Sequence, residues 1–238
     1  MPLEIFNPGI MDVFGEALRD FYTDNFTQKL ILHTSYGEPE DMPLDIFFRD
    51  EEEMSEVELE ALSCCYGNVL DIGAGVGSHA LALQELELDV TALEISPLAA
   101  EIMQQRGVAK IINQDIFTYS GDTYDTLLLL MNGIGLVGDI AGLRQFLQHA
   151  KKLINPNGQL VFDSSDITYL YEGNLPDGEK YYGEIAYQYE YRQVKGEWFK
   201  WLYIDQDTLA EIAGEEGWLT IIQYEDEQDQ YLARLILA

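Results

Sequence analysis

Cysteine is nearly absent from this chain of 238 residues, which contains only Cys64 and Cys65. Two adjacent cysteines cannot supply a disulfide framework, and two ligands are too few for a tetrahedral zinc site. We therefore predict no metal site. We expect both side chains to pack at the end of the helix that precedes the first strand of the main sheet.

Basic residues are also scarce. The chain has 13 lysines and arginines against 43 aspartates and glutamates, which gives a formal net charge of -30. Such a chain repels a phosphate backbone instead of neutralising it, so nucleic acids are disfavoured as partners. Two interpretations of the acidity stay open: it attracts amines and basic peptides, or it only keeps the protein soluble.

Long apolar runs are missing as well. No stretch of about 18 apolar residues, the length that spans a bilayer, occurs in the sequence. The start MPLEIFNPGI has neither the basic segment nor the long apolar segment of a secretory signal. We expect a cytoplasmic protein that contacts no membrane.

Strands and helices are predicted to alternate from residue 67 onward. The apolar spacing predicts strands at 69–72, 89–94, 109–113, 124–131 and 159–163, and helices at 77–87, 97–106 and 139–154. A further helix at 206–216 and strands at 218–224 and 231–237 end the chain. This alternation is typical of an α/β protein with a parallel sheet and right-handed crossovers.

Two segments fall outside the alternating pattern. Residues 11–32 have helical spacing and residues 50–60 predict an acidic helix, so we assign residues 1–66 to an amino-terminal helical cap. Residues 182–204 alternate as a β-hairpin with a turn at Lys195-Gly196, and nine aromatic residues lie between Tyr181 and Tyr203. These rings either form a wall over a ligand site or only stabilise the hairpin.

A glycine-rich turn is the most specific pattern in the sequence. Residues 69–79 read VLDIGAGVGSH, in which a short apolar run is followed by Gly73, Gly75 and Gly77. Glycines at this spacing suit a chain that turns from a strand into a helix close to a ligand, because glycine adopts positive φ without strain. We expect the backbone N–H groups of the turn to be free for a polar ligand.

Two carboxylates accompany the turn. Asp71 precedes the first glycine by two residues, and Glu94 ends the next predicted strand. A doubly wound fold places at this second position the acid that binds ribose hydroxyls. The dinucleotide fingerprint has a glycine where this chain has Ser78, and Asp71 suits a cationic ligand better than a pyrophosphate.

With these residues the chain resembles the class I S-adenosylmethionine-dependent methyltransferases. VLDIGAGVGSH and Glu94 in ALEIS match the first two motifs of that family, and KIINQDI, YDTLLLLM and QLVFD look like its third to fifth strands. The match covers roughly residues 66–163. It implies a doubly wound, Rossmann-like, mostly parallel seven-stranded sheet with a reversed last strand, here carrying a hairpin insertion at about 180–204 within a core of residues 67–238.

The resemblance also implies S-adenosylmethionine as cofactor, with S-adenosylhomocysteine as product. Asp115 would accept from the adenine amino group, and Ile116 would pack on the ring. The implied cofactor-binding residues are Asp71, Gly73, Ala74, Gly75, Gly77, Glu94, Ile95, Asp115, Ile116, Met131 and Asn132.

The catalytic residues are less constrained. Methyl transfer needs the acceptor lone pair aligned with the S–CH₃ axis in a dry site, whereas a base is optional. The candidates for such a base are Asp163 at the end of the fifth strand, His33 in the cap and Tyr22. Each has a structural alternative: Asp163 can cap a turn, His33 can be a packing residue, and Tyr22 can lie on a helix surface.

The acceptor is predicted to be a small molecule. The loop NGIGLVG after the fourth strand lacks the acidic or Asn-Pro-Pro-Tyr signature of enzymes that methylate nucleic-acid bases or glutamine. Three alternatives stay open: a methyltransferase acting on basic peptides, a non-catalytic S-adenosylmethionine-binding protein, and an NAD-dependent enzyme. The sequence does not indicate an oligomeric state.

Overall fold

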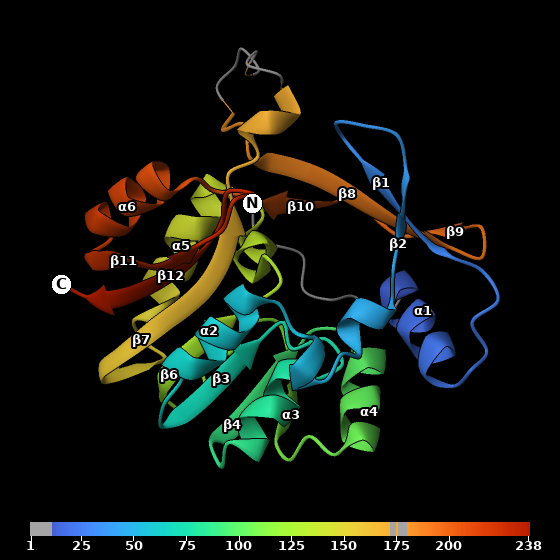
Figure 1. Ribbon diagram of the computed structural model, residues 1–238, viewed down its shortest axis with the longest axis horizontal. Coiled ribbons are helices and arrows are strands. Elements are labelled where there is room, and N and C mark those ends of the chain that lie inside the picture. Colours follow the sequence, from blue (N-terminus) through green and yellow to red (C-terminus); the bar gives the residue numbers. More distant parts are fainter. Residues whose placement is uncertain (1–10, 172–174, 176–179) are drawn as a thin grey trace.

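The computed structural model describes residues 11–171, 175 and 180–238, and two β-sheets organise it (Figure 1). Its α-helices are α1 (Val13–Tyr22), α2 (Glu56–Cys64), α3 (Ser78–Glu85), α4 (Pro97–Arg106), α5 (Ile140–Ala150) and α6 (Gln206–Glu215). Its strands are β1 (Leu30–Thr34), β2 (Glu40–Met42), β3 (Asn68–Ile72), β4 (Asp89–Glu94), β5 (Ile111–Asn113), β6 (Tyr124–Leu129), β7 (Ile154–Ser165), β8 (Glu184–Tyr191), β9 (Val194–Lys195), β10 (Phe199–Leu202), β11 (Trp218–Glu225) and β12 (Gln230–Leu237). Short 3-10 helices are η1 (Asp45–Phe47), η2 (Glu51–Glu53), η3 (Gly133–Val137) and η4 (Thr168–Tyr171).

The main sheet has seven strands in the order β11-β12-β7-β6-β3-β4-β5. The five strands from β3 to β7 run parallel to one another. β12 runs antiparallel between β7 and β11. The predicted doubly wound, mostly parallel sheet with a reversed last strand is confirmed.

Helices cover both faces of the main sheet (Figure 1). α5 and α6 pack on one face through residues such as Phe146, and α2 and α3 cover the other through residues such as Val57. Val69, Leu70 and Ile72 of β3 are therefore all buried, which explains why this strand reads as an apolar run without alternation. Burial of each such side chain stabilises the fold by about 1.5–3 kcal/mol.

The second sheet has the order β10-β8-β1-β2, with β9 paired to β8. The prediction of helix through residue 32 is wrong, because α1 ends at Tyr22, Asp24 has a φ of 56°, and residues 30–34 form β1. β1 pairs antiparallel with β8, so that Leu32 lies opposite Tyr189 and Thr34 opposite Tyr187. The amino-terminal cap is thus partly β-structure, because a distant strand is available for pairing.

The hairpin turn also differs from the prediction. Arg192 and Gln193 have φ values of 50° and 64°, as the two central residues of a type I′ turn require. Lys195, which was expected in the turn, pairs with Glu190 as part of β9. The turn lies three residues earlier because Arg192 and Gln193, and not Gly196, adopt the left-handed conformation.

Helix α1 attaches the second sheet to the main one. It packs on α4 in a cluster that includes Leu18 and Ile102 (Figure 1). The Asp12 side chain caps α1 by accepting from the Gly15 N–H, and it also accepts from the Ser96 hydroxyl at the start of α4. None of the helices in the described part of the chain has the length and apolar character that a bilayer crossing requires.

Candidate functional site

The carboxyl ends of the parallel strands meet at one edge of the main sheet, which we call the carboxyl edge. Asp71 lies within β3 just before its end, Glu94 ends β4, Asn132 follows β6, and Asp163 lies near the end of β7. Ligands of open α/β sheets bind outside this edge, where strand order reverses. In this sheet the order reverses between β3 and β6.

The N–H groups of the glycine turn after β3 donate mainly to acceptors in β4. Gly73, Gly75 and Gly77 all have positive φ, at 71°, 56° and 87°. The N–H groups of Gly73 and Ala74 donate to the Leu93 carbonyl, and the Gly75 N–H donates to Glu94 Oε2 at 2.8 Å. The Gly77 N–H donates to the Ala74 carbonyl. The expectation that these N–H groups are free is therefore wrong at four positions, because β4 supplies acceptors for three of them and the turn itself for the fourth.

Gly75 is the point of the turn with the most open space. A Cβ built on Gly75 meets no atom within 4 Å, whereas a Cβ built on Gly77 would lie 2.6 Å from Val108 Cγ2. Gly77 is thus required by packing and by its conformation. Gly75 leaves a gap through which a ligand can approach the backbone.

Asp71 carries an unsatisfied carboxylate oxygen. Its side chain is 2% exposed, and Oδ2 is buried without a hydrogen-bond partner. Burial raises the pKa of Asp71 to about 6, although nearby His79 and the Ala80 N–H act in the opposite direction. A buried acceptor without a partner costs about 1–3 kcal/mol, so the site gains from a donor or cation that reaches it.

Glu94 is buried, and each of its carboxylate oxygens accepts one backbone hydrogen bond. Oε1 accepts from the Ser96 N–H and Oε2 from the Gly75 N–H, both at 2.8 Å. Burial raises the pKa of Glu94 to about 7, while these two N–H donors lower it and Asp12 raises it further. Each oxygen keeps a second lone pair, so the carboxylate can still accept from a ligand.

The segment after β5 places the remaining nucleoside candidates. Asp115 is half-buried and accepts from the Phe117 N–H at 2.8 Å. Ile116 points into the core and is 5% exposed, whereas Ile95 is 45% exposed beside Glu94. Of these two apolar residues, Ile95 has the surface available to cover a ring.

Met131 and Asn132 hold an unusual backbone conformation at the end of β6. Their φ values are 62° and 58°, in the left-handed region that non-glycine residues seldom adopt. The Asn132 N–H lies 2.9 and 2.8 Å from the two oxygens of Asp163. Asp163 therefore stabilises the strained corner from the neighbouring strand.

The contacts of Asp163 fit a positioning role better than that of a base. The side chain is fully buried, and Oδ2 also accepts from Gln230 Nε2 at 2.8 Å. Burial raises the pKa of Asp163, while the Asn132 N–H and the Gln230 amide lower it. Both oxygens point to protein donors, so this carboxylate is occupied.

The other two base candidates lie elsewhere. His33 pairs with Glu190 at 2.7 Å, and its strand neighbours show that it lies on the face of the second sheet opposite Leu32. The Tyr22 ring stacks on Phe48 with centroids 6.0 Å apart, in the cluster around α1. His33, Tyr22 and Asp163 share no contact partner, so the structure does not bring the three together.

The face of the second sheet that carries Tyr187 and Tyr189, which we call the aromatic face, lies over the carboxyl edge. Burial raises the pKa of Tyr189, and the charges of Tyr203 and Glu94 raise it further. Trp201 packs against Gly135 of η3. The Tyr203 hydroxyl lies beside the Asn132 amide and 3.0 Å from the Tyr187 hydroxyl. From the sequence, a wall over a ligand site was one of two interpretations of these rings, and Tyr187 and Tyr203 could not be singled out.

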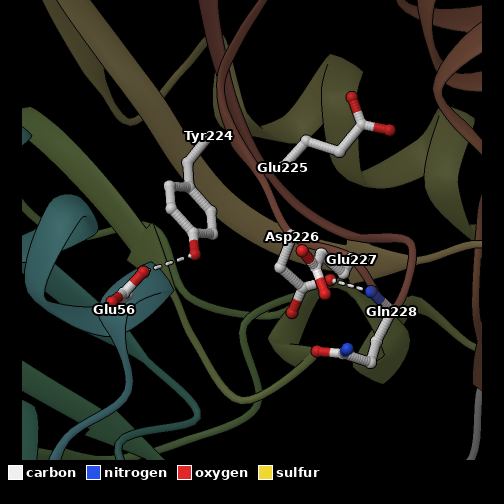
Figure 2. A pocket seen from close by; sticks show the side chains of 6 residues that line it. All are labelled: Glu56, Tyr224, Glu225, Asp226, Glu227 and Gln228. Carbon is white, nitrogen blue, oxygen red and sulfur yellow. Dashed lines mark hydrogen bonds between the residues drawn. The ribbon is translucent and has the colours of Figure 1, made fainter.

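An open depression lies on the side of the molecule formed by α2 and the turn between β11 and β12 (Figure 2). It has a volume of about 570 Å³ and is lined by Glu56, Tyr224, Glu225, Asp226, Glu227 and Gln228. Its polar groups are partly paired, since Tyr224 donates to Glu56 and Asp226 accepts from the Gln228 N–H. Among the described residues no group of three His, Cys, Asp or Glu side chains is arranged to hold a metal ion.

A family model described as "Methyltransferase domain" matches residues 34–223. The chain is 38% identical to a SAM-dependent methyltransferase from Bacteroides fragilis, solved in complex with S-adenosyl-L-homocysteine. The similarity covers 99% of this chain and 98% of that one, with a TM-score of 0.90.

More distant structures share the fold. The CcbJ methyltransferase from Streptomyces caelestis is 12% identical over 82% of this chain and 95% of its own, with a TM-score of 0.61. The sugar N-methyltransferase KedS8 from Streptoalloteichus sp ATCC 53650 is 16% identical over 83% and 94%, with a TM-score of 0.55. No curated protein sequence matches the chain.

Proposed function

The chain belongs to the class I S-adenosylmethionine-dependent methyltransferases, and on this premise we propose that it methylates a small molecule held between the carboxyl edge and the aromatic face. S-adenosylmethionine is the cofactor and S-adenosylhomocysteine the product. This cofactor takes the place of the NAD considered from the sequence.

The residues at the carboxyl edge fit this cofactor. The unpaired Oδ2 of Asp71 is a buried anionic acceptor suited to the cationic end of the ligand, and Gly75 leaves open space beside it. In our proposal Glu94 accepts from the ribose hydroxyls, Asp115 accepts from the adenine amino group, and Ile95 covers the ring. When bound, the cofactor supplies an electrophilic methyl group on a positively charged sulfur.

The protein contributes orientation and exclusion of water. Asp163 holds the Asn132 corner in place, and the buried ring of Tyr187 closes the side facing the second sheet. A fixed acceptor beside the methyl group removes much of the entropic barrier to in-line displacement, and a dry site strengthens the electrostatic interactions within it.

The observation that carries the small-molecule proposal is the cover over the carboxyl edge. Trp201 lies against Gly135, where β10 packs on η3. A site covered in this way favours a compact acceptor over an extended chain. KedS8, which shares the fold, is a methyltransferase of sugars. The competing candidate is a basic peptide, which the formal charge of -30 would attract.

The test compares acceptor classes under one readout. Formation of S-adenosylhomocysteine is measured with a panel of polar metabolites and with a library of lysine- and arginine-rich peptides, and products are identified by mass spectrometry. We expect methylated products only in the metabolite panel. Methylated peptides without methylated metabolites would refute the proposal, and tight cofactor binding without any product would favour a non-catalytic protein.

Glu94→Ala provides the control for background turnover. Loss of hydrogen bonds to a charged group costs about 1.5–3 kcal/mol, so cofactor affinity should fall about 10- to 100-fold. Product formation that is not reduced by this substitution at subsaturating cofactor would come from a contaminant or would disprove the assigned role of Glu94.

A further inference from the structure

We propose that the acceptor is a neutral primary or secondary amine whose N–H donates to Asn132 Oδ1 and whose nitrogen receives the methyl group. This inference rests on the proposed function and specifies the substrate class of the same site. The evidence comes from the Asn132 corner, from the groups around it and from the charge of the molecule.

The Asn132 corner is held in one position despite its strain. Met131 and Asn132 both have positive φ, and neither is a glycine. Both oxygens of Asp163 accept from the Asn132 N–H, and Gln230 fixes Asp163 from β12. Strained residues that are held in place by the surrounding fold cluster at functional sites, so we infer a functional role for the Asn132 side chain.

The Asn132 side chain offers an acceptor without a donor. Oδ1 is buried and has no hydrogen-bond partner, while the amide lies beside the Tyr203 hydroxyl. An unsatisfied buried carbonyl oxygen carries a free-energy penalty that an incoming N–H or O–H removes. The acceptor molecule is therefore a hydrogen-bond donor at the position next to Asn132, which excludes a tertiary amine, a carboxylate or a thioether.

The choice between N–H and O–H follows from the carboxylates of the described residues at the carboxyl edge, none of which is left as a base for the acceptor. Asp163 accepts from Asn132 and Gln230. In the proposed function, Glu94 accepts from the cofactor ribose and Asp71 faces the cationic end of the cofactor, so neither carboxylate is left for the acceptor. An alcohol must lose its proton during methylation, because its lone pair is a poor nucleophile while the proton remains. A primary or secondary amine can enter in its neutral form after its ammonium proton has been lost to water, and its lone pair then needs no base in the site.

The three histidines of the chain do not provide a base for the acceptor either. His33 pairs with Glu190 on the other face of the second sheet, His79 pairs with Glu58, and His149 lies near the end of α5. None of them contacts Asn132, Tyr187 or Tyr203. The described part of the chain thus has no histidine at the Asn132 corner.

The walls of the site suit a nitrogen that becomes positively charged. Tyr187 donates to or accepts from Tyr203, and the rings of Tyr36 and Tyr187 meet edge to face at 6.4 Å. Burial raises the pKa of Tyr187 and of Tyr203, so both hydroxyls stay neutral. Aromatic rings attract an ammonium ion, and a protein of charge -30 favours cations over anions.

The proposed step balances without a further reactant. The amine lone pair forms the new N–C bond while the S–C bond breaks, and the electron pair of that bond stays on sulfur, which becomes a neutral thioether. The positive charge passes to nitrogen as an alkylammonium. One N–H proton then leaves to water after the product departs.

The first test identifies the methylated atom. S-adenosylmethionine labelled with ¹³C in its methyl group is incubated with the enzyme and with amino acids, amino sugars and amino alcohols, each paired with its hydroxy counterpart. We expect the NMR signal of ¹³C to appear at N-methyl positions only. Labelled O-, S- or C-methyl products, or amines no better than their hydroxy counterparts, would overturn the inference.

The second test uses two variants of one residue. Asn132→Gly keeps the left-handed backbone and removes the amide, whereas Asn132→Asp keeps an acceptor oxygen and also tolerates this conformation. For the best amine, KM should rise at least about tenfold in Asn132→Gly and be largely restored in Asn132→Asp. Affinity for S-adenosylhomocysteine, measured by calorimetry, should change less than about threefold in both.

The outcomes separate this inference from the function on which it rests. Hydroxy compounds methylated in place of amines would refute the amine assignment and leave a small-molecule methyltransferase. Peptides methylated in place of both would refute the two proposals together. If the amine KM rises and the cofactor affinity falls by the same factor in Asn132→Gly, Asn132 binds the cofactor, and the acceptor assignment is overturned.

Discussion

Two buried acids at the carboxyl edge have opposite effects on folding and on ligand binding. Burial raises the pKa of Asp71 to about 6 and that of Glu94 to about 7. Both values lie above those of the unfolded chain, so the folded protein binds these protons more tightly. Their contribution to stability is therefore greatest at low pH and is lost as the pH rises from about 4 to about 7.

Glu58 has the opposite dependence. Burial tends to raise its pKa, but hydrogen bonds with His79 and Ser55 prevail and lower the pKa to about 2. Its stabilising contribution is present above the unfolded pKa of about 4.5 and is lost as the pH falls toward 2. Stability of the ligand-free protein is thus expected to decrease on both sides of weakly acidic pH.

Binding of the cationic cofactor should release protons. Asp71 and Glu94 bind it best as carboxylates, so affinity for S-adenosylmethionine is expected to rise between pH 5 and pH 7. Calorimetry in two buffers of different ionisation heat measures both the affinity and the released protons. In Asp71→Asn the rise should become smaller and the affinity at pH 7 lower. A pH-independent affinity in the unmodified protein would contradict the prediction.

At this scale the sequence identified the acids but not their surroundings. Asp71 and Glu94 followed from their spacing to the glycines. Glu94 accepts from the N–H groups of Gly75 and Ser96, and Asp163 accepts from the Asn132 N–H. These hydrogen bonds form only because the strands lie side by side in the folded protein. Such pairings leave no local signal.

Among the structural elements, the glycine turn has two glycines with different roles, because Gly77 is needed for packing and, in our proposal, Gly75 for ligand binding. Gly75 has open space around it, whereas Gly77 faces Val108 and Met103. Both have positive φ, so alanine costs roughly 1–2 kcal/mol at either position from backbone strain alone.

The matched substitutions should therefore have different effects. Gly77→Ala adds overpacking of about 1–3 kcal/mol, so it should lower the free energy of unfolding more than Gly75→Ala does. Gly75→Ala should destabilise less but reduce cofactor affinity at least about tenfold, because its methyl group enters the ligand space. Urea unfolding and calorimetry measure the two effects. Equal stability losses with unchanged affinity in Gly75→Ala would argue against a ligand at this turn.

Elements were predicted accurately where their burial is visible in the sequence itself. The main strands have helices on both sides, so they appear in the sequence as apolar runs. β1 was read as helix because its partner, β8, lies far along the chain, and pairing with Tyr187 and Tyr189 overrides local propensity. The turn at Arg192 was missed because neither residue there is a typical turn former.

For the molecule as a whole, the excess of acidic residues sets the response to salt. With a formal charge of -30, self-repulsion destabilises the compact state. Several of its ion pairs, such as Lys200 with Asp139, lie at the surface and contribute little. Screening should therefore stabilise the protein on balance.

Melting temperature should rise with sodium chloride. The screening length falls from about 30 Å at 0.01 M to about 3 Å at 1 M salt, which weakens repulsion across the surface. A gain on the order of 1–2 kcal/mol corresponds to roughly 2–8 °C for a chain of this size. Potassium chloride should act equally, since the effect depends on ionic strength. A constant or falling melting temperature would show that favourable ion pairs dominate.

The pairing of β1 with β8 has a consequence for biosynthesis. His33 and Glu190 are 157 positions apart, so the amino-terminal strand leaves the ribosome long before its partner is translated. At about 5–20 residues per second this delay is roughly 8–30 seconds. Over that interval the edge of β1 that will pair with β8 has no partner, so it is open to pairing with other chains.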